Sequence, residues 1–218
     1  MKIQGVIFDM DGLMFDTERL FSHYWTDACR DYGIPRKEEF VQAVRGSSGE
    51  KMLACVRRYY GEELDAQAFC HRCYEYVDEY LKTTVPKKKG LDELLAWLKA
   101  RGLPAAVASS TYRSLVERNL RTAGVEEYFR EVVTGDQVEH GKPAPDIFLL
   151  AARRLGLAPG NCLVLEDSFN GVRAGAAAGC VTVMIPDLSQ PTPELLSLCS
   201  GCLEDLGQVP DFIERYEG

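Results

Sequence analysis

Asp9 and Asp11 end a short, largely apolar run near the start of the chain, and Gly12 follows them. Such a run, ended abruptly by charge, predicts a buried strand whose acidic end emerges from a sheet. Because side chains alternate along a strand, both carboxylates point to the same side, where they repel each other. A divalent cation, a shared proton or both would offset this repulsion, and carboxylate oxygens suit Mg²⁺. The same residues also fit an ordinary polar turn after a strand.

Three later segments place further polar groups beside predicted strand ends. Ser109 and Ser110 follow one strand, Glu166 and Asp167 follow another, and Lys142 lies in a loop between them. Taken singly, the serines and the acidic pair are typical of helix N-caps, and the lysine is typical of a solvated loop. Taken together they favour Mg²⁺-dependent chemistry on a phosphate ester. The metal screens the nucleophile from the ester, the ammonium adds a second cation, and hydroxyl and backbone N–H groups hold phosphoryl oxygens.

The larger part of the chain, from Pro86 onward, alternates between strand and helix patterns. This alternation predicts an α/β fold of Rossmann-like type, a doubly wound parallel sheet with helices on both faces. In such sheets, ligands bind beyond the carboxyl ends of the strands, which is where the polar residues above are expected. After the first strand, the predicted strands are 103–108, 131–134, 162–165 and 181–185, and the predicted helices are about 92–101, 111–124, 145–155 and 168–179, with short helices from Pro193 and Asp211.

Residues 16–85 carry only helical patterns. Apolar positions recur at helical spacing, a Ser47–Glu50 capping box opens one helix, and Asp65 caps another. The chain leaves the sheet for this segment at the ligand-binding end, so the segment is expected to act as a lid. The predicted domains are therefore an α-helical insertion, residues 16–85, and an α/β core, residues 1–15 and 86–218.

Composition narrows the class of protein. The chain has 218 residues, 46% of them apolar, which is enough for a substantial core, and its net charge of −8 argues against nucleic acid as a main partner. No segment approaches the roughly 20 apolar residues of a membrane span, and no signal-peptide pattern opens the chain. We therefore expect a cytoplasmic protein whose eight cysteines are reduced. A monomer is the default expectation, because the sequence carries no signal of oligomeric state. The pairs Cys70/Cys73 and Cys199/Cys202 lie too far apart in sequence to indicate a zinc site.

Four segments resemble the motifs of the haloacid dehalogenase-like phosphatase superfamily, in the family's order. FDMDGLMFDT is similar to the first motif, ASS to the second, GKPAPDIF to the third and LEDSFNG to the fourth, so the resemblance spans essentially the whole chain. The helical insertion after the first motif resembles the family's cap domain. The resemblance implies a haloacid dehalogenase-like core with an inserted α-helical cap, Mg²⁺ as cofactor, and a small phosphorylated metabolite as substrate.

The resemblance also implies a role for each matching residue. Asp9 attacks phosphorus to form an aspartyl-phosphate, and Asp11 protonates the leaving alkoxide and then accepts a proton from water. Ser109 hydrogen-bonds to the phosphoryl group, and Lys142 pairs with that group and with Asp9. The implied Mg²⁺ ligands are Asp9, the Asp11 backbone carbonyl, Glu166 and Asp167.

The cap is expected to select the substrate, because the core contacts mainly the phosphoryl group. Within the family, the chain is most similar to the branch that holds β-phosphoglucomutase and small sugar- or nucleotide-phosphate phosphatases. Residues expected to contact the substrate are Gly12, Ser110 and Asn170 of the core, with Asn170 also supporting the metal-side loop, and Glu18, Arg45, Ser48, Lys51 and Tyr76 of the cap.

Among the possible functions, the sequence favours a phosphomonoester hydrolase. The mutase branch carries a cap arginine where this chain has Gly49 and a histidine where it has Phe21, although Arg45 or Lys51 could substitute. The run Asp16–Leu20 is more similar to phosphatases, including those acting on pseudouridine 5′-phosphate. A β-phosphoglucomutase-type mutase is the alternative. A phospho-Asp signalling receiver is the third possibility, but it would be shorter and would lack the helical insertion.

Overall fold

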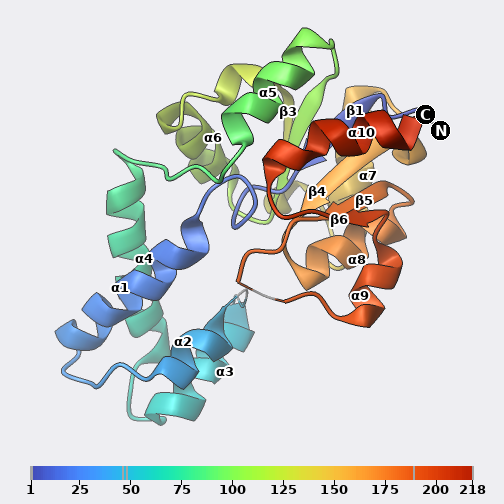
Figure 1. Cartoon of the computed structure of the whole chain (residues 1–218). Helices are drawn as coiled ribbons and strands as arrows, with labels where there is room; N and C mark the ends of the chain where they lie inside the picture. The colour runs from blue at the N-terminus through green and yellow to red at the C-terminus, as the bar shows by residue number, and fades with distance from the viewer. Residues whose placement is uncertain (1, 46, 48, 189, 218) are drawn as a thin grey trace. The chain divides into compact units, whose positions relative to one another are not determined.

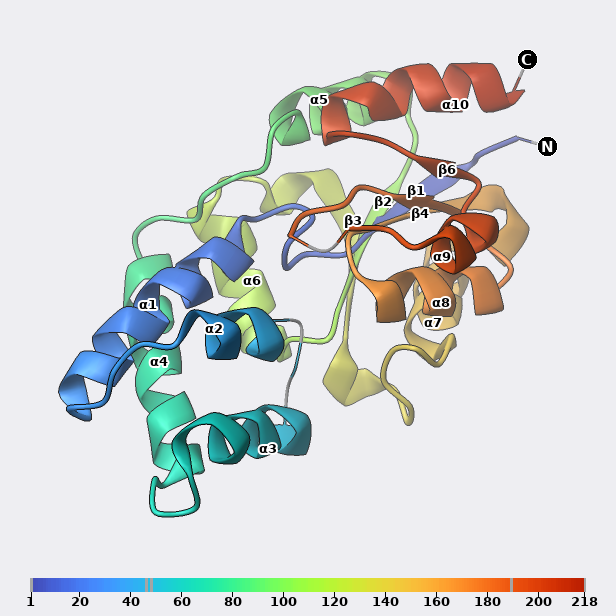
Figure 2. The same ribbon diagram turned by 60° about the horizontal axis from the view of Figure 1, so that its bottom comes forward.

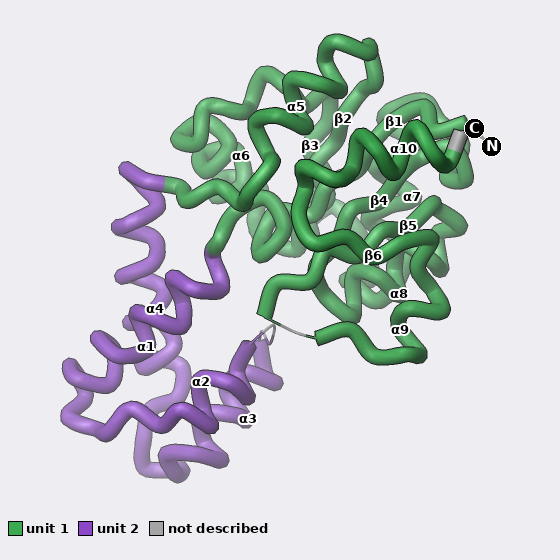
Figure 3. Tube along the Cα trace, in the orientation of Figure 1, with its two compact units in different colours: residues 1–16, 85–218 green, residues 17–84 purple. Residues whose placement is uncertain are grey.

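The computed structural model describes residues 2–45, 47, 49–188 and 190–217. The chain divides into two compact units, one of Met1–Asp16 with Val85–Gly218 and the other of Thr17–Thr84 (Figure 3). We call the first the α/β unit, because it contains all the strands of the described chain, and the second the helical unit.

Six strands form the sheet of the α/β unit: β1 Gly5–Phe8, β2 Ala105–Ser109, β3 Phe129–Thr134, β4 Cys162–Glu166, β5 Val181–Met184 and β6 Gly201–Cys202. Their order is β3-β2-β1-β4-β5-β6, and every neighbouring pair is parallel (Figure 1). β1 and β4 are fully buried, as expected of strands that are apolar except for Glu166 at the end of β4. The winding reverses between these two central strands, which confirms the predicted doubly wound α/β fold.

Helices cover both faces of this sheet: α5 Leu91–Ala100, α6 Arg113–Thr122, α7 Asp146–Leu155, α8 Phe169–Ala177, α9 Pro193–Leu198 and α10 Val209–Glu217. Figure 2 shows α5 and α10 on one side of the strands and α7 and α8 on the other. On the second side, Ile7, Ala106 and Val164 of the three central strands belong to one apolar core with Phe148 and Ala174. A register slip would turn these residues out of the core, so this packing fixes where the strands end.

In the described part of the helical unit there are four α-helices: α1 Thr17–Asp31, α2 Glu38–Val44, α3 Gly49–Tyr60 and α4 Ala66–Leu81. Trp25, Phe40 and Phe69 meet in its core, where the Phe40 ring lies edge-on to Trp25 at 5.1 Å between ring centroids. The aromatic residues predicted on helical faces thus build the core of this unit. None of the described helices has the length and hydrophobicity that crossing a bilayer requires.

The helix caps and the short elements of the structure can be compared with the sequence predictions. Asp65 caps α4 as predicted, accepting a hydrogen bond from the Ala68 N–H at 3.0 Å. The Ser47 hydroxyl donates to the Val44 carbonyl at 2.5 Å, and α3 begins at Gly49. The predicted Ser47–Glu50 box stays a prediction. α2 and β6 are absent from the predictions, because their seven and two residues are too few for a periodic pattern.

Candidate active site

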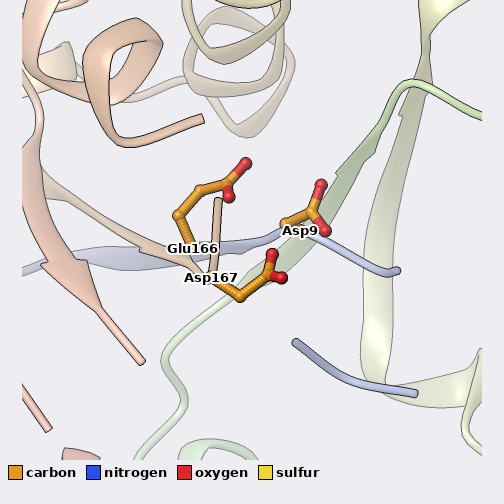
Figure 4. A group of neighbouring side chains, drawn as sticks. All are labelled: Asp9, Glu166 and Asp167. Atoms are coloured by element: carbon orange, nitrogen blue, oxygen red, sulfur yellow. The ribbon is translucent and has the colours of Figure 1, made fainter. Parts of the chain in front are cut away.

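Carboxylates meet at the carboxyl ends of the two central strands. Asp9 directly follows β1, Glu166 is the last residue of β4, and Asp167 comes next. The Asp9 backbone N–H donates to the Leu165 carbonyl at 3.0 Å, so the pairing of β1 with β4 extends to Asp9. Figure 4 shows the three acidic side chains grouped at these strand ends. The parallel register therefore brings together residues that lie far apart in the sequence.

The ammonium group of Lys142 lies between two of these carboxylates. Its Nζ is 2.5 Å from Asp9 Oδ1 and 2.7 Å from Glu166 Oε1, and it donates to the Ala108 carbonyl at 3.1 Å. These partners match the three N–H donors of an ammonium group. The Lys142 side chain is 7% exposed and that of Glu166 is 0% exposed. Lys142 is therefore a buried part of the site rather than a solvated loop residue.

Burial and neighbouring charge disturb the protonation of this pair. Burial raises the pKa of Asp9 from its ordinary 3.8 to about 8, against the opposing effect of Lys142, and the charges of Glu166 and Asp11 add to the rise. Burial lowers the pKa of Lys142, but the carboxylates of Asp9 and Glu166 outweigh it, so the net shift is upward. The ammonium group stays charged, yet it does not balance the acidic groups around it, and the site is short of positive charge.

A divalent cation would supply the missing charge, and the side chains present fit one. Carboxylate oxygens of Asp9, Glu166 and Asp167 lie within 4.8 Å of one another, and hard ions such as Mg²⁺ prefer oxygen ligands. Gly12 lies against this group, since a Cβ there would be 2.3 Å from Asp167 Oδ2 and its φ is +85°. Only glycine allows the backbone this close approach in this conformation.

Gly171, in the first turn of α8, packs against Glu166 even more closely. A Cβ at this position would lie 1.7 Å from Glu166 Oε1. Gly171→Ala is therefore expected to displace Glu166 from Lys142, to lower turnover, and to destabilise the fold by about 1–3 kcal/mol, as overpacking does. Urea denaturation and steady-state kinetics measure these effects. In the control, Gly160→Ala, the new Cβ makes an ordinary 3.8 Å contact with the Gly179 carbonyl, and equal destabilisation of the two variants would contradict the prediction.

Two hydroxyl groups, one at the end of β2 and one just after it, lie beside the Asp11 carboxyl group. Thr111 Oγ1 donates to Asp11 Oδ2 at 2.8 Å, whereas Ser109 Oγ lies 3.4 Å from the same oxygen. Ser109 is fully buried, and its Oγ accepts the Thr111 backbone N–H at 3.0 Å. The N-cap of α6 is Tyr112, which makes no side-chain capping bond. Helix capping therefore does not explain these hydroxyls, although the sequence alone allowed it.

Ser168 serves both a helix and the site. Its Oγ accepts the Gly171 N–H at 3.1 Å at the start of α8 and donates to Glu166 Oε2 at 2.9 Å. Its backbone N–H donates to the same oxygen at 3.0 Å. With Lys142 on Oε1, both oxygens of Glu166 are held in place. Ser168 and Thr111 are absent from the predicted site, although each directly follows a predicted pair.

The other predicted residues occupy varied positions. Ser110 is exposed just beyond β2, and Asn170 is exposed in the first turn of α8. Their contact with a substrate stays a prediction, as does that of the expected cap residues. Those residues belong to the helical unit: Glu18 on α1, Arg45 after α2, Lys51 on α3 and Tyr76 on α4, while Ser48 lies outside the described residues.

Known proteins resemble this chain along most of its length. Residues 6–185 match the sequence model of the haloacid dehalogenase-like hydrolase family. The fructose-1-phosphate phosphatase YqaB of Escherichia coli is 34% identical over 82% of this chain and 94% of its own. A probable pseudouridine-5′-phosphatase of Drosophila melanogaster is 36% identical over 98% and 97%. The crystal structure of CbbY from Rhodobacter sphaeroides in complex with phosphate superposes with a TM-score of 0.77, at 26% identity, over 95% and 96%.

The matched segment contains all four motifs on which the resemblance rests, and both curated relatives carry phosphatase names. The signalling-receiver interpretation has no support from these matches. From the family match and the length of the shared sequence, the chain belongs to the haloacid dehalogenase-like hydrolase family and is an enzyme of its phosphatase group.

Proposed function

We propose that this chain is a Mg²⁺-dependent phosphomonoester hydrolase that acts, as a cytoplasmic monomer, on a small sugar or nucleotide phosphate. The observation that carries the proposal is the buried Lys142 ammonium bound to Asp9 at the mouth of the sheet. The names of the relatives support the substrate class, since one is named for fructose 1-phosphate and another for pseudouridine 5′-phosphate.

In the first step, a carboxylate oxygen of Asp9 attacks phosphorus. The Asp9 O–P bond forms as the ester P–O bond breaks, and the electron pair leaves on the alkoxide oxygen, which takes the proton of the Asp11 carboxyl. The Ser109 hydroxyl donates to a phosphoryl oxygen. Lys142 acts on the phosphoryl group through its charge, because its three N–H donors already have partners.

In the second step, water attacks the aspartyl-phosphate. The water oxygen bonds to phosphorus, Asp11 accepts its proton, and the Asp9 O–P bond breaks to return the carboxylate. The products are an alcohol and inorganic phosphate, and Asp11 recovers the proton that it gave up. Two aspartates can take different roles only in different surroundings. Asp9 is buried against Lys142, whereas Asp11 faces hydroxyl groups at the end of β2 and just after it.

The metal would be held by Asp9, Glu166 and Asp167 with the Asp11 backbone carbonyl. When bound, Mg²⁺ neutralises these carboxylates and polarises the phosphoryl group of the ester. Glu166 keeps its orientation through Ser168 and Lys142. Residues of the chain therefore hold this metal-binding carboxylate in place before any metal binds.

Mg²⁺ is expected to raise the melting temperature more at about pH 8 than at about pH 6. Without metal, the pKa of Asp9 is raised from 3.8 to about 8, so between these values the native protein holds a proton that the unfolded chain has lost. Metal-free stability therefore falls as the pH rises through this window. Mg²⁺ must displace that proton, and the competition weakens as the pH rises. Scanning calorimetry with and without MgCl₂ measures both shifts, and equal shifts would contradict a metal site at Asp9.

A phosphate-release assay tests the proposed function. The panel holds sugar phosphates, nucleoside monophosphates and short phosphorylated acids, each with Mg²⁺ or with a chelator. We expect Mg²⁺-dependent release of inorganic phosphate from at least one sugar or nucleotide phosphate. Conversion of β-glucose 1-phosphate to glucose 6-phosphate with little phosphate released would establish a mutase instead. No reaction with any member of the panel would overturn the proposal.

A further inference from the structure

We propose that Thr111 is a positioning residue for Asp11, a role that rests on the hydrolysis proposed above. Thr111 is the second residue after β2 and is half-buried. Its Oγ1 donates to Asp11 Oδ2 at 2.8 Å. This bond fixes one oxygen of the Asp11 carboxyl group, and with it the orientation of the group that exchanges the proton.

Thr111 also frees Ser109 for the phosphoryl group. A serine hydroxyl has one proton to donate, so Ser109 cannot serve Asp11 and a phosphoryl oxygen together. Ser109 Oγ is 3.4 Å from Asp11 Oδ2, a longer contact than the 2.8 Å bond from Thr111. The two hydroxyl groups thus have separate roles: that of Thr111 binds the Asp11 carboxyl group, and that of Ser109 binds the phosphoryl group of the ester.

The support of the Thr111 hydroxyl is rigid. The Thr111 N–H donates to Ser109 Oγ at 3.0 Å, and Ser109 is the fully buried end of β2. A Cβ on Gly135 would lie 2.9 Å from the Ser110 carbonyl oxygen, so the backbone at Gly135 packs closely against the segment that carries Thr111. A β-branched side chain adds restriction at χ1. Catalytic groups depend on such fixed placement, because small displacements lower rates strongly.

A neutral hydroxyl suits an acid that becomes a base. The Thr111 hydroxyl donates to Oδ2 whether Oδ1 carries a proton or not. Asp11 therefore keeps one orientation through both steps of the reaction.

Two esters with different leaving groups test this role through kcat/KM. The best sugar phosphate of the panel releases an alkoxide that needs a proton, whereas p-nitrophenyl phosphate releases a phenolate that leaves without one. Thr111→Val keeps the shape of the side chain and removes its hydroxyl. It is expected to lower kcat/KM about 10²-fold for the sugar phosphate, the scale of a general-acid contribution, and much less for the aryl ester. Thr111→Ser retains the donor and is expected to recover most of the rate on the sugar phosphate.

Control variants separate positioning from structure. Thr122→Val makes the same change at the end of α6, and circular dichroism melts report folding; if Thr111→Val does not fold, Thr111→Ala carries the same comparison. Equal losses on both esters, or no loss on either, would overturn the role, because a folding or phosphoryl-binding defect affects both esters alike. Failure of the proposed function looks different, since the wild-type enzyme would then release phosphate from neither ester.

Discussion

Asp9→Asn is expected to lower kcat by at least about 10⁴-fold, the scale seen when a catalytic nucleophile is removed. The amide oxygen is a weak nucleophile and cannot form the acyl-phosphate bond. Steady-state kinetics on the best substrate of the panel, with phosphate release as the readout, measure the loss. Undiminished hydrolysis by this variant would refute the assignment of Asp9.

The same variant is expected to stay folded and, without metal near neutral pH, to melt no lower than the wild type. The raised pKa of Asp9 means that an ionised carboxylate is unfavourable in this buried position, and the amide avoids that penalty. Lys142 keeps Glu166 as a charged partner at 2.7 Å. Asp211→Asn, on the exposed side of α10, is the matched control and is expected to change neither rate nor melting temperature.

Lys142→Met is expected to abolish turnover and to destabilise the fold by about 3–5 kcal/mol, as removal of one partner from a buried ion pair does. The substitution leaves Asp9 and Glu166 buried without the cation that lies between them. Because Lys142 opposes the rise in the pKa of Asp9, its loss raises that pKa further. With Lys142 present Asp9 ionises near pH 8, whereas in the variant it holds its proton to higher pH, so the deficit is expected to grow as the pH rises through about 8. Urea midpoints at about pH 7 and about pH 9 measure the deficit and its growth.

Lys99→Met provides the comparison for Lys142. The Lys99 side chain is 61% exposed and lies 3.6 Å from Glu127, an exposed pair of the kind worth about 0–1 kcal/mol. Adding Asp9→Asn to Lys142→Met is expected to recover part of the lost stability, since one buried carboxylate is then gone. A Lys142→Met variant as stable as Lys99→Met would show that the buried ammonium is not needed to hold the site.

The gathering of Asp9 and Glu166 could be predicted because it follows from short-range patterns. Each residue ends an apolar run that reads as a buried strand, and parallel strands deliver their carboxyl ends to one edge. Lys142 does not end a strand, and it was predicted to lie in the site because its segment resembles a motif of the family. The doubly wound fold was predictable for the same reason, since strand and helix patterns alternate along the chain.

The parts of the site that escaped prediction depend on loop geometry. Thr111 stands where a helix cap would be expected, and only the folded structure shows that its hydroxyl donates to Asp11 instead. Ser168 does cap α8, and capping alone explains a serine at this position, so the sequence gives no indication of its second bond, to Glu166. Gly171 matters because a carboxylate from the preceding strand occupies the space of its missing side chain.

The sequence alone determined the family, the winding of the sheet and the convergence of the acidic residues. These follow from apolar periodicity and from motifs, which can be recognised along the chain without knowing how distant segments pack. Only the tertiary structure decided that the three donors of Lys142 go to Asp9, Glu166 and Ala108, and that burial raises the pKa of Asp9 to about 8. These are matters of distance and dielectric surroundings, which arise when distant segments pack together and exclude water.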